Sequence, residues 1–291
     1  MLFSLYCVGI FLTEKLSLKA CYSIAEVVAK VYYYVFSRND KLALRDNLRM
    51  VIGKDVDKET LDAHVLKIFI NFAKHIVDFF KLQKSTKDQI GKCIQVKGRH
   101  HLDEAVLQGK GVILLAAHLG SWELGGAAVA ALGYPVNALI LEHKDKRIND
   151  FFVGQREKSD VKGIPTGMQV KQCFRVLKAK EMLAIVVDKD YSGSNEYVEF
   201  FGEKTYMPKG AAVMALKTGA PIVVTSMIRK EDDTFCLKME KQILYKGTGH
   251  RDADVKSIMK KYLEIIETHI KECPDQWYAF EELWKRKRIT L

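Results

Sequence analysis

The sequence predicts an α/β fold, with a mostly parallel central sheet flanked by helices and a helical region at the N-terminus. From about residue 91 onward, short apolar runs alternate with helical stretches, an order typical of parallel sheets covered by helices. Before that point, apolar side chains recur at the helical period only. We therefore expect an N-terminal helical, membrane-associated region over 1–90 and an α/β core with C-terminal helices over 91–291.

The N-terminal region begins with 13 uncharged residues, MLFSLYCVGIFLT. A spanning helix needs about 20 apolar residues, so this run does not predict one, and it lacks the basic start and cleavage site of a signal peptide. Residues 16–36 are again apolar and end in four aromatic side chains, Tyr32, Tyr33, Tyr34 and Phe36. Aromatic residues with sparse lysines favour a helix at a membrane interface; a pair of ordinary core helices is the alternative.

The next helix and the core elements follow in chain order. An aromatic-rich stripe of helical period over 61–80 predicts a helix that faces a core. Apolar runs predict strands at 111–118, 136–141, 182–188 and 220–228, and the alternating pattern of 235–243 predicts an edge strand. Helices are expected up to about 132, around 147–160, 168–179 and 209–218, and from about 253 to 285 with a break at Pro274.

The charge balance indicates a negatively charged partner. Lys and Arg number 46 against 36 acidic residues, a formal net charge of +10, which favours anionic lipid, an acidic protein or nucleic acid; a merely soluble surface is the alternative. No nucleic-acid-binding module accompanies the basic tail KRKR at 285–288. We therefore expect no nucleic-acid partner, and anionic head groups or an acidic carrier protein explain the tail more simply. The six cysteines are scattered, as in a reducing compartment.

The stretch LLAAHLGSWELGG, residues 114–126, carries the candidate chemistry. His118 follows a predicted strand at the carboxyl edge of the sheet, where ligand crevices of α/β folds form. Ser121 can cap the following helix, and Glu123 lies in the first turn of that helix. Glu123 could accept the Nδ1 proton of His118 and leave Nε2 free as a base. A core histidine and a carboxylate that favours the helix dipole are the alternative interpretations.

A histidine with a carboxylate five positions later is expected about once by chance in a chain of this composition. The spacing therefore says nothing about function, and the evidence for a catalytic role is the position of His118 at the end of a predicted strand. The chain has no G-x-S-x-G nucleophile elbow. If His118 activates a hydroxyl, that hydroxyl therefore belongs to the substrate.

Several segments, in this order and spacing, resemble one protein family. They are RDNL at 45–48, HLGSWEL at 118–124, Arg156 in GQREKSDVKGIP, VVDKDYSG at 186–193, the segment from EFFGEKTYMPKG to KTGAPIV, and CPDQWYAFEELWKRK. The chain is similar to the late acyltransferases of lipid A biosynthesis, the lauroyl/myristoyl transferases. These belong to the His-x-x-x-x-(Asp/Glu) glycerolipid acyltransferase superfamily. Ser121 stands where the family usually has Asn, and Lys189 where it usually has Gln.

The resemblance implies a membrane-associated O-acyltransferase on the cytoplasmic face of the bacterial inner membrane. It would move an acyl chain from an acyl carrier protein or coenzyme A thioester to a hydroxyl of a lipid A-type glycolipid, without a metal or a bound cofactor. His118 and Glu123 would be catalytic. Arg156, or the N–H groups near Ser121, would stabilise the oxyanion; Arg156 could instead hold a phosphate or form a surface ion pair. The implied substrate-binding residues are Arg156, Gly120, Ser121, Asp188, Phe201, Gly202, Lys209 and Gly210.

Three other functions stay open from the sequence. The acceptor could be a glycerophospholipid or another lipid head group. Asp188 and Asp190 form a D-x-D pair, as in metal-dependent glycosyltransferases, although the intervening Lys189 argues mildly against a metal. The chain could also be a non-catalytic lipid-binding protein on the same fold.

Overall fold

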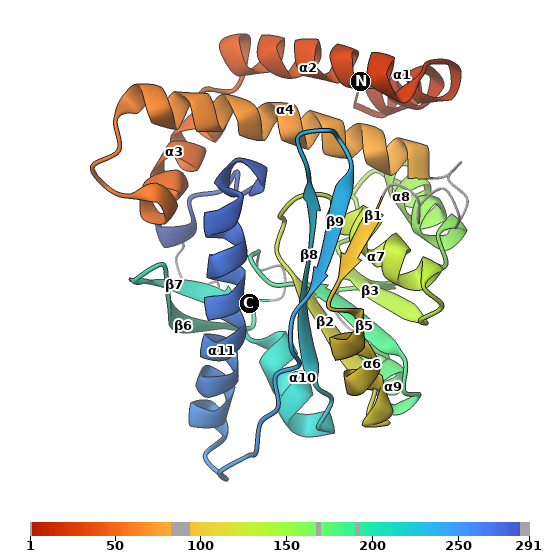
Figure 1. The fold of residues 1–291 in the computed structure, drawn as a ribbon, viewed down its shortest axis with the longest axis vertical. Coiled ribbons are helices and arrows are strands. Elements are labelled where there is room, and N and C mark those ends of the chain that lie inside the picture. The colour runs from red at the N-terminus through yellow and green to blue at the C-terminus, as the bar shows by residue number, and fades with distance from the viewer. Residues whose placement is uncertain (1, 83–93, 167–169, 190–192, 286–291) are drawn as a thin grey trace.

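A computed structural model of the 291-residue chain describes residues 2–82, 94–166, 170–189 and 193–285. It confirms the α/β fold, with a seven-stranded, mostly parallel sheet in the order β1-β9-β8-β2-β5-β3-β4. Helices flank the sheet, and the chain begins with a helical region (Figure 1). The start of the helix expected at 168–179 lies outside the described residues.

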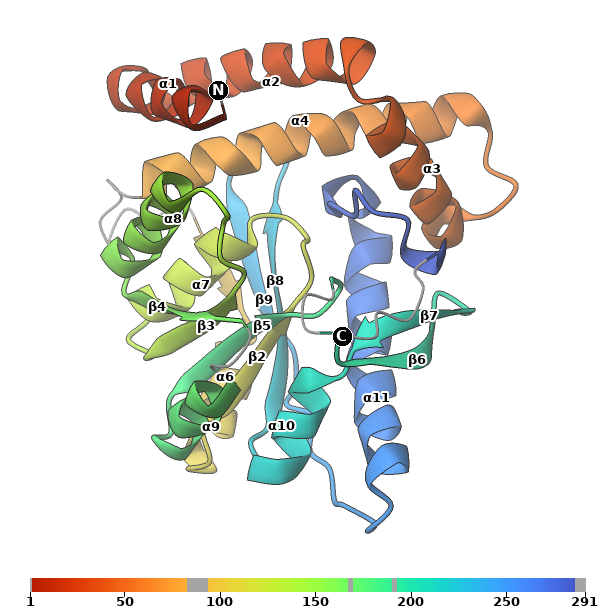
Figure 2. The ribbon, with the colours of Figure 1, turned by 180° about the vertical axis from the view of Figure 1, so that it is seen from behind.

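Within residues 2–82, the N-terminal region forms four helices, α1 (Leu2–Lys15), α2 (Leu18–Val35), α3 (Arg38–Ile52) and α4 (Lys58–Leu82). The long helix α4 crosses one end of the α/β core, and α1 and α2 lie on its outer side in both views (Figures 1 and 2). No helix in the described ranges is both long and apolar enough to cross a membrane.

The core elements alternate along the chain. The seven strands of the main sheet are β1 (Ile94–Lys97), β2 (Val112–Ala116), β3 (Val136–Ile140), β4 (Val161–Pro165), β5 (Met182–Val186), β8 (Ile222–Arg229) and β9 (Phe235–Met239). The helices are α6 (Arg99–Leu107), α7 (Trp122–Ala131), α8 (Lys146–Lys158), α9 (Val170–Lys178), α10 (Gly210–Thr218) and α11 (Arg251–Glu272). A separate hairpin joins β6 (Asn195–Phe200) to β7 (Glu203–Pro208), and short 3-10 turns follow at Pro274–Gln276 and Leu283–Lys285.

The sheet differs from the sequence prediction at its edges. The segment predicted as an edge strand, 235–243, forms β9 inside the sheet, where it pairs antiparallel with β8 and parallel with β1. The alternating pattern of β9 arises because one of its two faces is buried more deeply than the other. This difference between faces does not prevent the strand from pairing with a neighbour on each side. The true edges, β1 and β4, were not predicted, because β1 has only four residues and β4 contains Gly163 and Pro165.

A buried polar cluster joins the N-terminal helices to the sheet. Arg229 of β8 forms an ion pair with Asp78 of α4 and donates to the Tyr22 hydroxyl of α2 at 3.0 Å. Tyr22 in turn donates to Asp78 at 2.5 Å. Each charge in this cluster has a partner, as the burial of ionic groups requires. The cluster therefore sets how α2 and α4 lie against the core.

Strand register places the site. β2 and β5 are parallel neighbours whose last residues, Ala116 and Val186, face each other. The main-chain N–H of Val187 still donates to the Ala116 carbonyl at 3.0 Å. Residues two positions beyond each strand end therefore meet at the carboxyl edge of the sheet, and those residues are His118 and Asp188.

Candidate active site

The loop that carries His118 is clamped by the C-terminal segment. The Tyr278 N–H donates to the His118 carbonyl at 2.8 Å, and the Gly120 N–H donates to the Gln276 carbonyl at 2.9 Å. Gly120 has φ +62°, and a Cβ there would lie 2.0 Å from the Met227 carbonyl oxygen. Only glycine fits this turn, so Gly120 serves close backbone packing.

The His118 ring is held by Asp188. Nδ1 of His118 lies 2.6 Å from Oδ1 of Asp188, and Oδ2 accepts the His118 main-chain N–H at 3.0 Å. The indole N–H of Trp277 also donates to Oδ2 at 3.0 Å. A carboxylate at Nδ1 selects the tautomer with the proton on Nδ1, which leaves the Nε2 lone pair free.

Asp188 stays ionised in this environment. Its side chain is 2% exposed, and burial alone would raise its pKa. The charge of His118 and the hydrogen bonds from His118 and Trp277 outweigh burial and hold the pKa at about 2. Asp188 is therefore a carboxylate at neutral pH.

Glu123 is not the partner of His118, contrary to the sequence prediction. It binds Arg156 of α8 in a two-point ion pair, with Nε 3.0 Å from Oε2 and Nη2 2.5 Å from Oε1. The two side chains are only 12% (Arg156) and 16% (Glu123) exposed. The two N–H groups of a guanidinium match a carboxylate better than a single imidazole N–H does. Glu123 therefore links α7 to α8 through Arg156, and Asp188 binds the His118 ring.

Ser121 also departs from the prediction. It occupies the N-cap position of α7 but makes no capping hydrogen bond with its side chain. Its hydroxyl lies instead 3.2 Å from Nδ1 of the buried His75. The His75 ring stacks on Trp122 at 4.0 Å between centroids, and Trp122 contacts the His118 ring edge-on at 5.0 Å. Burial and the charges of Arg229 and His118 lower the His75 pKa to about 3. The ring is therefore uncharged at neutral pH and forms part of the cavity wall.

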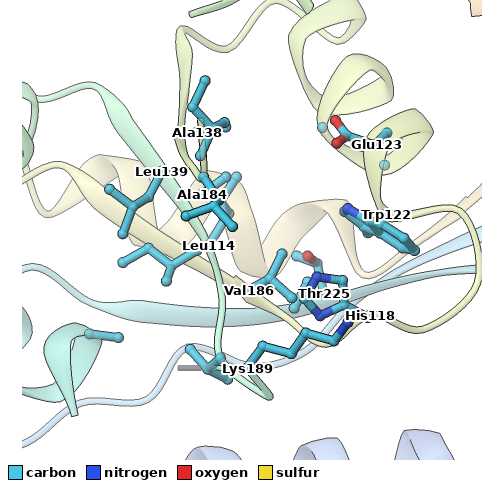
Figure 3. A pocket seen from close by; sticks show the side chains of 18 of the residues that line it. Leu114, His118, Trp122, Glu123, Ala138, Leu139, Ala184, Val186, Lys189 and Thr225 are labelled. Carbon is cyan, nitrogen blue, oxygen red and sulfur yellow. The ribbon is translucent and has the colours of Figure 1, made fainter. Parts of the chain in front are cut away.

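A cavity of about 630 Å³ lies beside His118. Figure 3 shows His118 and Lys189 at one side of it, apolar strand side chains such as Leu114 and Val186 beside them, and Glu123 apart on α7. Aromatic side chains of α1 and α4, including Tyr6 and Phe79, line the cavity as well. The walls are mostly apolar, which suits a long apolar ligand.

The remaining predicted residues fall into two groups. Lys209 and Gly210 line the cavity, and Lys209 forms an ion pair with Glu196 at 3.1 Å. Phe201 and Gly202 belong to the β6–β7 turn; the Phe201 ring packs on Trp277 at 6.1 Å and thus supports Asp188 from behind. These two residues lie outside the cavity wall.

The structure gives no support to a metal at the D-x-D pair. Both oxygens of Asp188 face N–H donors, and Asp190 lies outside the described residues. Across the described ranges, no group of three His, Cys, Asp or Glu side chains could hold a metal ion.

Trp277 and Gln276 are site residues that the sequence alone does not single out. The signal was present, because both belong to the CPDQWYAF segment on which the resemblance rests. Their role becomes visible only when the chain brings this segment beside 118–120, where Leu119 and Trp277 form a β-bridge.

Comparison with known proteins gives the class of enzyme. The chain belongs to the bacterial lipid A biosynthesis acyltransferase family, whose model matches residues 1–286, and the protein is therefore an acyltransferase. The family suggested by the resemblance is thereby confirmed.

The individual relatives share only 20–26% sequence identity with this chain. A phosphatidylinositol mannoside acyltransferase of Mycolicibacterium smegmatis is 25% identical over 248 residues, which cover 83% of this chain and 78% of the relative. A lipid A biosynthesis palmitoleoyltransferase of Escherichia coli is 26% identical over 204 residues, 69% of this chain and 63% of the relative. A lipid A biosynthesis acyltransferase of Haemophilus influenzae is 20% identical over 223 residues, which cover 76% of this chain and 69% of the relative.

The partner of the imidazole can be checked by NMR of the His118 ring nitrogens. Asp188→Asn should shift the tautomer balance and the Nδ1 resonance, because the charged acceptor is lost. Glu123→Gln should leave both unchanged, because Glu123 contacts Arg156. A tautomer change in Glu123→Gln alone, with Asp188→Asn unaffected, would restore the partner predicted from sequence.

Proposed function

We propose that the protein is a membrane-associated O-acyltransferase that moves a fatty acyl chain from a thioester to a hydroxyl of a lipid A-type glycolipid. The observation that carries the proposal is the His118–Asp188 pair, at 2.6 Å, beside an apolar cavity. The thioester belongs to an acyl carrier protein or to coenzyme A.

The geometry of the His118–Asp188 pair supports the following steps. Nε2 of His118 takes the proton of the acceptor hydroxyl as its oxygen attacks the thioester carbonyl carbon. A C–O bond forms, and the carbonyl electron pair moves to oxygen. The tetrahedral intermediate then collapses, the C–S bond breaks, and the thiolate takes the proton from the imidazolium. Asp188 keeps the ring oriented and stabilises its positive charge while it exists, in the manner of the acid of a catalytic triad.

The Glu123–Arg156 ion pair supports this chemistry indirectly. It ties the first turn of α7, directly after the His118 loop, to α8 across the cavity wall. We assign Glu123 a positioning role in place of the orienting role predicted from sequence. Arg156, bound at two points by Glu123, is thereby part of the wall.

The relatives support a sugar-bearing lipid acceptor. The names of the relatives from Escherichia coli and Haemophilus influenzae refer to lipid A biosynthesis, and the mycobacterial name refers to a phosphatidylinositol mannoside. The second candidate is therefore acylation of a glycolipid of the phosphatidylinositol mannoside type, favoured by the longer matched share of the mycobacterial relative. Mass spectrometry of membrane lipids made with and without the protein separates the two acceptors.

The outer face of α1 and α2 supports membrane association. Exposed apolar side chains recur on α2 at helical spacing, namely Ile24, Val27, Val28, Val31 and Val35, and Val8 and Phe11 of α1 are exposed as well. Tyr6 on the same helix α1 lines the cavity. We assign this face to the cytoplasmic surface of the bacterial inner membrane, whose anionic lipids suit the net charge of +10. An acceptor lipid could then reach the cavity from the bilayer.

Loss of rate on substitution tests the chemistry. His118→Ala should lower single-turnover transfer on the order of 10²–10⁴-fold, because a lipid hydroxyl is a poor nucleophile without a base. Asp188→Asn should cost about 10²-fold or more through the wrong tautomer, and Glu123→Gln should cost less than Asp188→Asn. The exposed His250→Ala is the matched control. A His118→Ala protein that keeps its fold and its transfer rate would remove the proposal.

Flotation with vesicles of phosphatidylethanolamine and phosphatidylglycerol tests the membrane face. Val27→Asp/Val31→Asp should weaken binding at least about ten-fold, because each buried valine is worth about 1.5–3 kcal/mol. Leu107→Asp, at an exposed apolar site on α6 away from this face, should bind like the unaltered protein (Figure 1). Equal binding of all three proteins would show that α2 does not meet the bilayer.

A further inference from the structure

The proposed transfer creates an oxyanion, and several of the donors expected from the sequence already have other partners in the structure. Donors placed for a developing oxyanion provide one of the largest single contributions to acyl-transfer catalysis. The N–H groups beside His118 are engaged, with Leu119 donating to Ala117, Gly120 to Gln276 and Ser121 to Met227 at 2.7, 2.9 and 2.8 Å. Arg156 is held at two points by Glu123.

Lys189 stands where a donor is needed. It directly follows Asp188, the carboxylate that holds His118, and it lines the same cavity. Figure 3 shows its side chain reaching toward the His118 ring. Within the part of the chain that the structure describes, Lys189 has neither an ion pair nor a hydrogen bond to a carboxylate.

The other cations of the cavity wall are committed elsewhere or lie at its rim. Lys209 forms an ion pair with Glu196, and the Lys217 ammonium lies 5.7 Å from the centre of the Phe174 ring. Arg251 is an exposed residue at the first position of α11. Lys189 lines the cavity, and Figure 3 shows it beside His118.

We propose that Lys189 is a catalytic residue whose ammonium group donates a hydrogen bond to the thioester carbonyl oxygen as that oxygen becomes an oxyanion. This inference rests on the proposed acyl transfer. As the hydroxyl oxygen bonds to the carbonyl carbon, an electron pair moves to the carbonyl oxygen. The positive charge of Lys189 stabilises the negative charge that forms there. When the C–S bond breaks, the pair returns to re-form the carbonyl, and Lys189 keeps its proton throughout.

The half-buried position suits this role. An ammonium beside an apolar wall interacts more strongly with a developing negative charge than one in water does. The contact strengthens only as charge develops on oxygen, so it acts on the transition state more than on donor binding. Removal of one such donor costs on the order of 10²–10³-fold in kcat.

The test compares Lys189→Ala and Lys189→Gln with Lys178→Ala, an exposed lysine on α9. Transfer is followed with lauroyl- and palmitoyl-coenzyme A and with the matching acyl carrier protein thioesters. Lys189→Ala should lose on the order of 10²–10³-fold in kcat with the donor KM unchanged. Lys189→Gln, which keeps a neutral donor, should lose less. Lys178→Ala should match the unaltered protein.

A non-reacting ligand separates catalysis from binding. S-dodecyl-coenzyme A has no carbonyl, so its affinity, measured by calorimetry, should be equal in Lys189→Ala and the unaltered protein. An unchanged kcat would overturn the inference. So would a rise in donor KM together with an equal loss of thioether affinity, because Lys189 would then bind a donor phosphate. Failure of the unaltered protein to transfer from every thioester would instead remove the proposed function itself.

Discussion

The site depends on one buried carboxylate. Asp188 is 2% exposed, yet its two oxygens receive the His118 ring, the His118 main-chain N–H and the Trp277 indole. Three donors replace the water that burial removes, so the charge persists where an unpaired carboxylate would be neutral. The position of the histidine, its tautomer and the placement of the C-terminal segment all follow from the need to satisfy this group.

Several parts of the fold together supply the hydrogen-bond partners of the Asp188 carboxylate. The parallel register of β2 and β5 brings residues 118 and 188 together, a glycine at 120 allows the loop to approach Met227, and residues 276–278 close over it. The hairpin residues Phe200 and Phe201 pack on Trp277. Family segments that are far apart in sequence thus serve one carboxylate–histidine pair.

The sequence predicted the fold class well, because the alternation of apolar runs with helical stretches is a local signal that sheet formation preserves. It missed β1 and β4, since strands of mixed composition, with polar residues in both and Gly163 and Pro165 in β4, carry little such signal. It placed His118 correctly at a strand end but chose the wrong carboxylate. Glu123 is near in sequence, whereas Asp188 is near only once β2 and β5 are neighbours, and strand order is a property of the whole chain. The capping role expected of Ser121 failed for the same reason, because His75 reaches its hydroxyl from α4.

The most direct measurement of this dependence is the single-turnover transfer rate of Trp277→Phe, alone and combined with Asp188→Asn. The phenyl ring keeps most of the packing but cannot donate to Oδ2. Because a hydrogen bond to a charged group is worth about 1.5–3 kcal/mol, Trp277→Phe should slow transfer by about ten-fold or more. In the Asp188→Asn background it should cost little further, because Trp277 acts through that carboxylate. An unchanged rate in Trp277→Phe, or losses that add in full, would show that the Asp188 carboxylate is not the group on which the site depends.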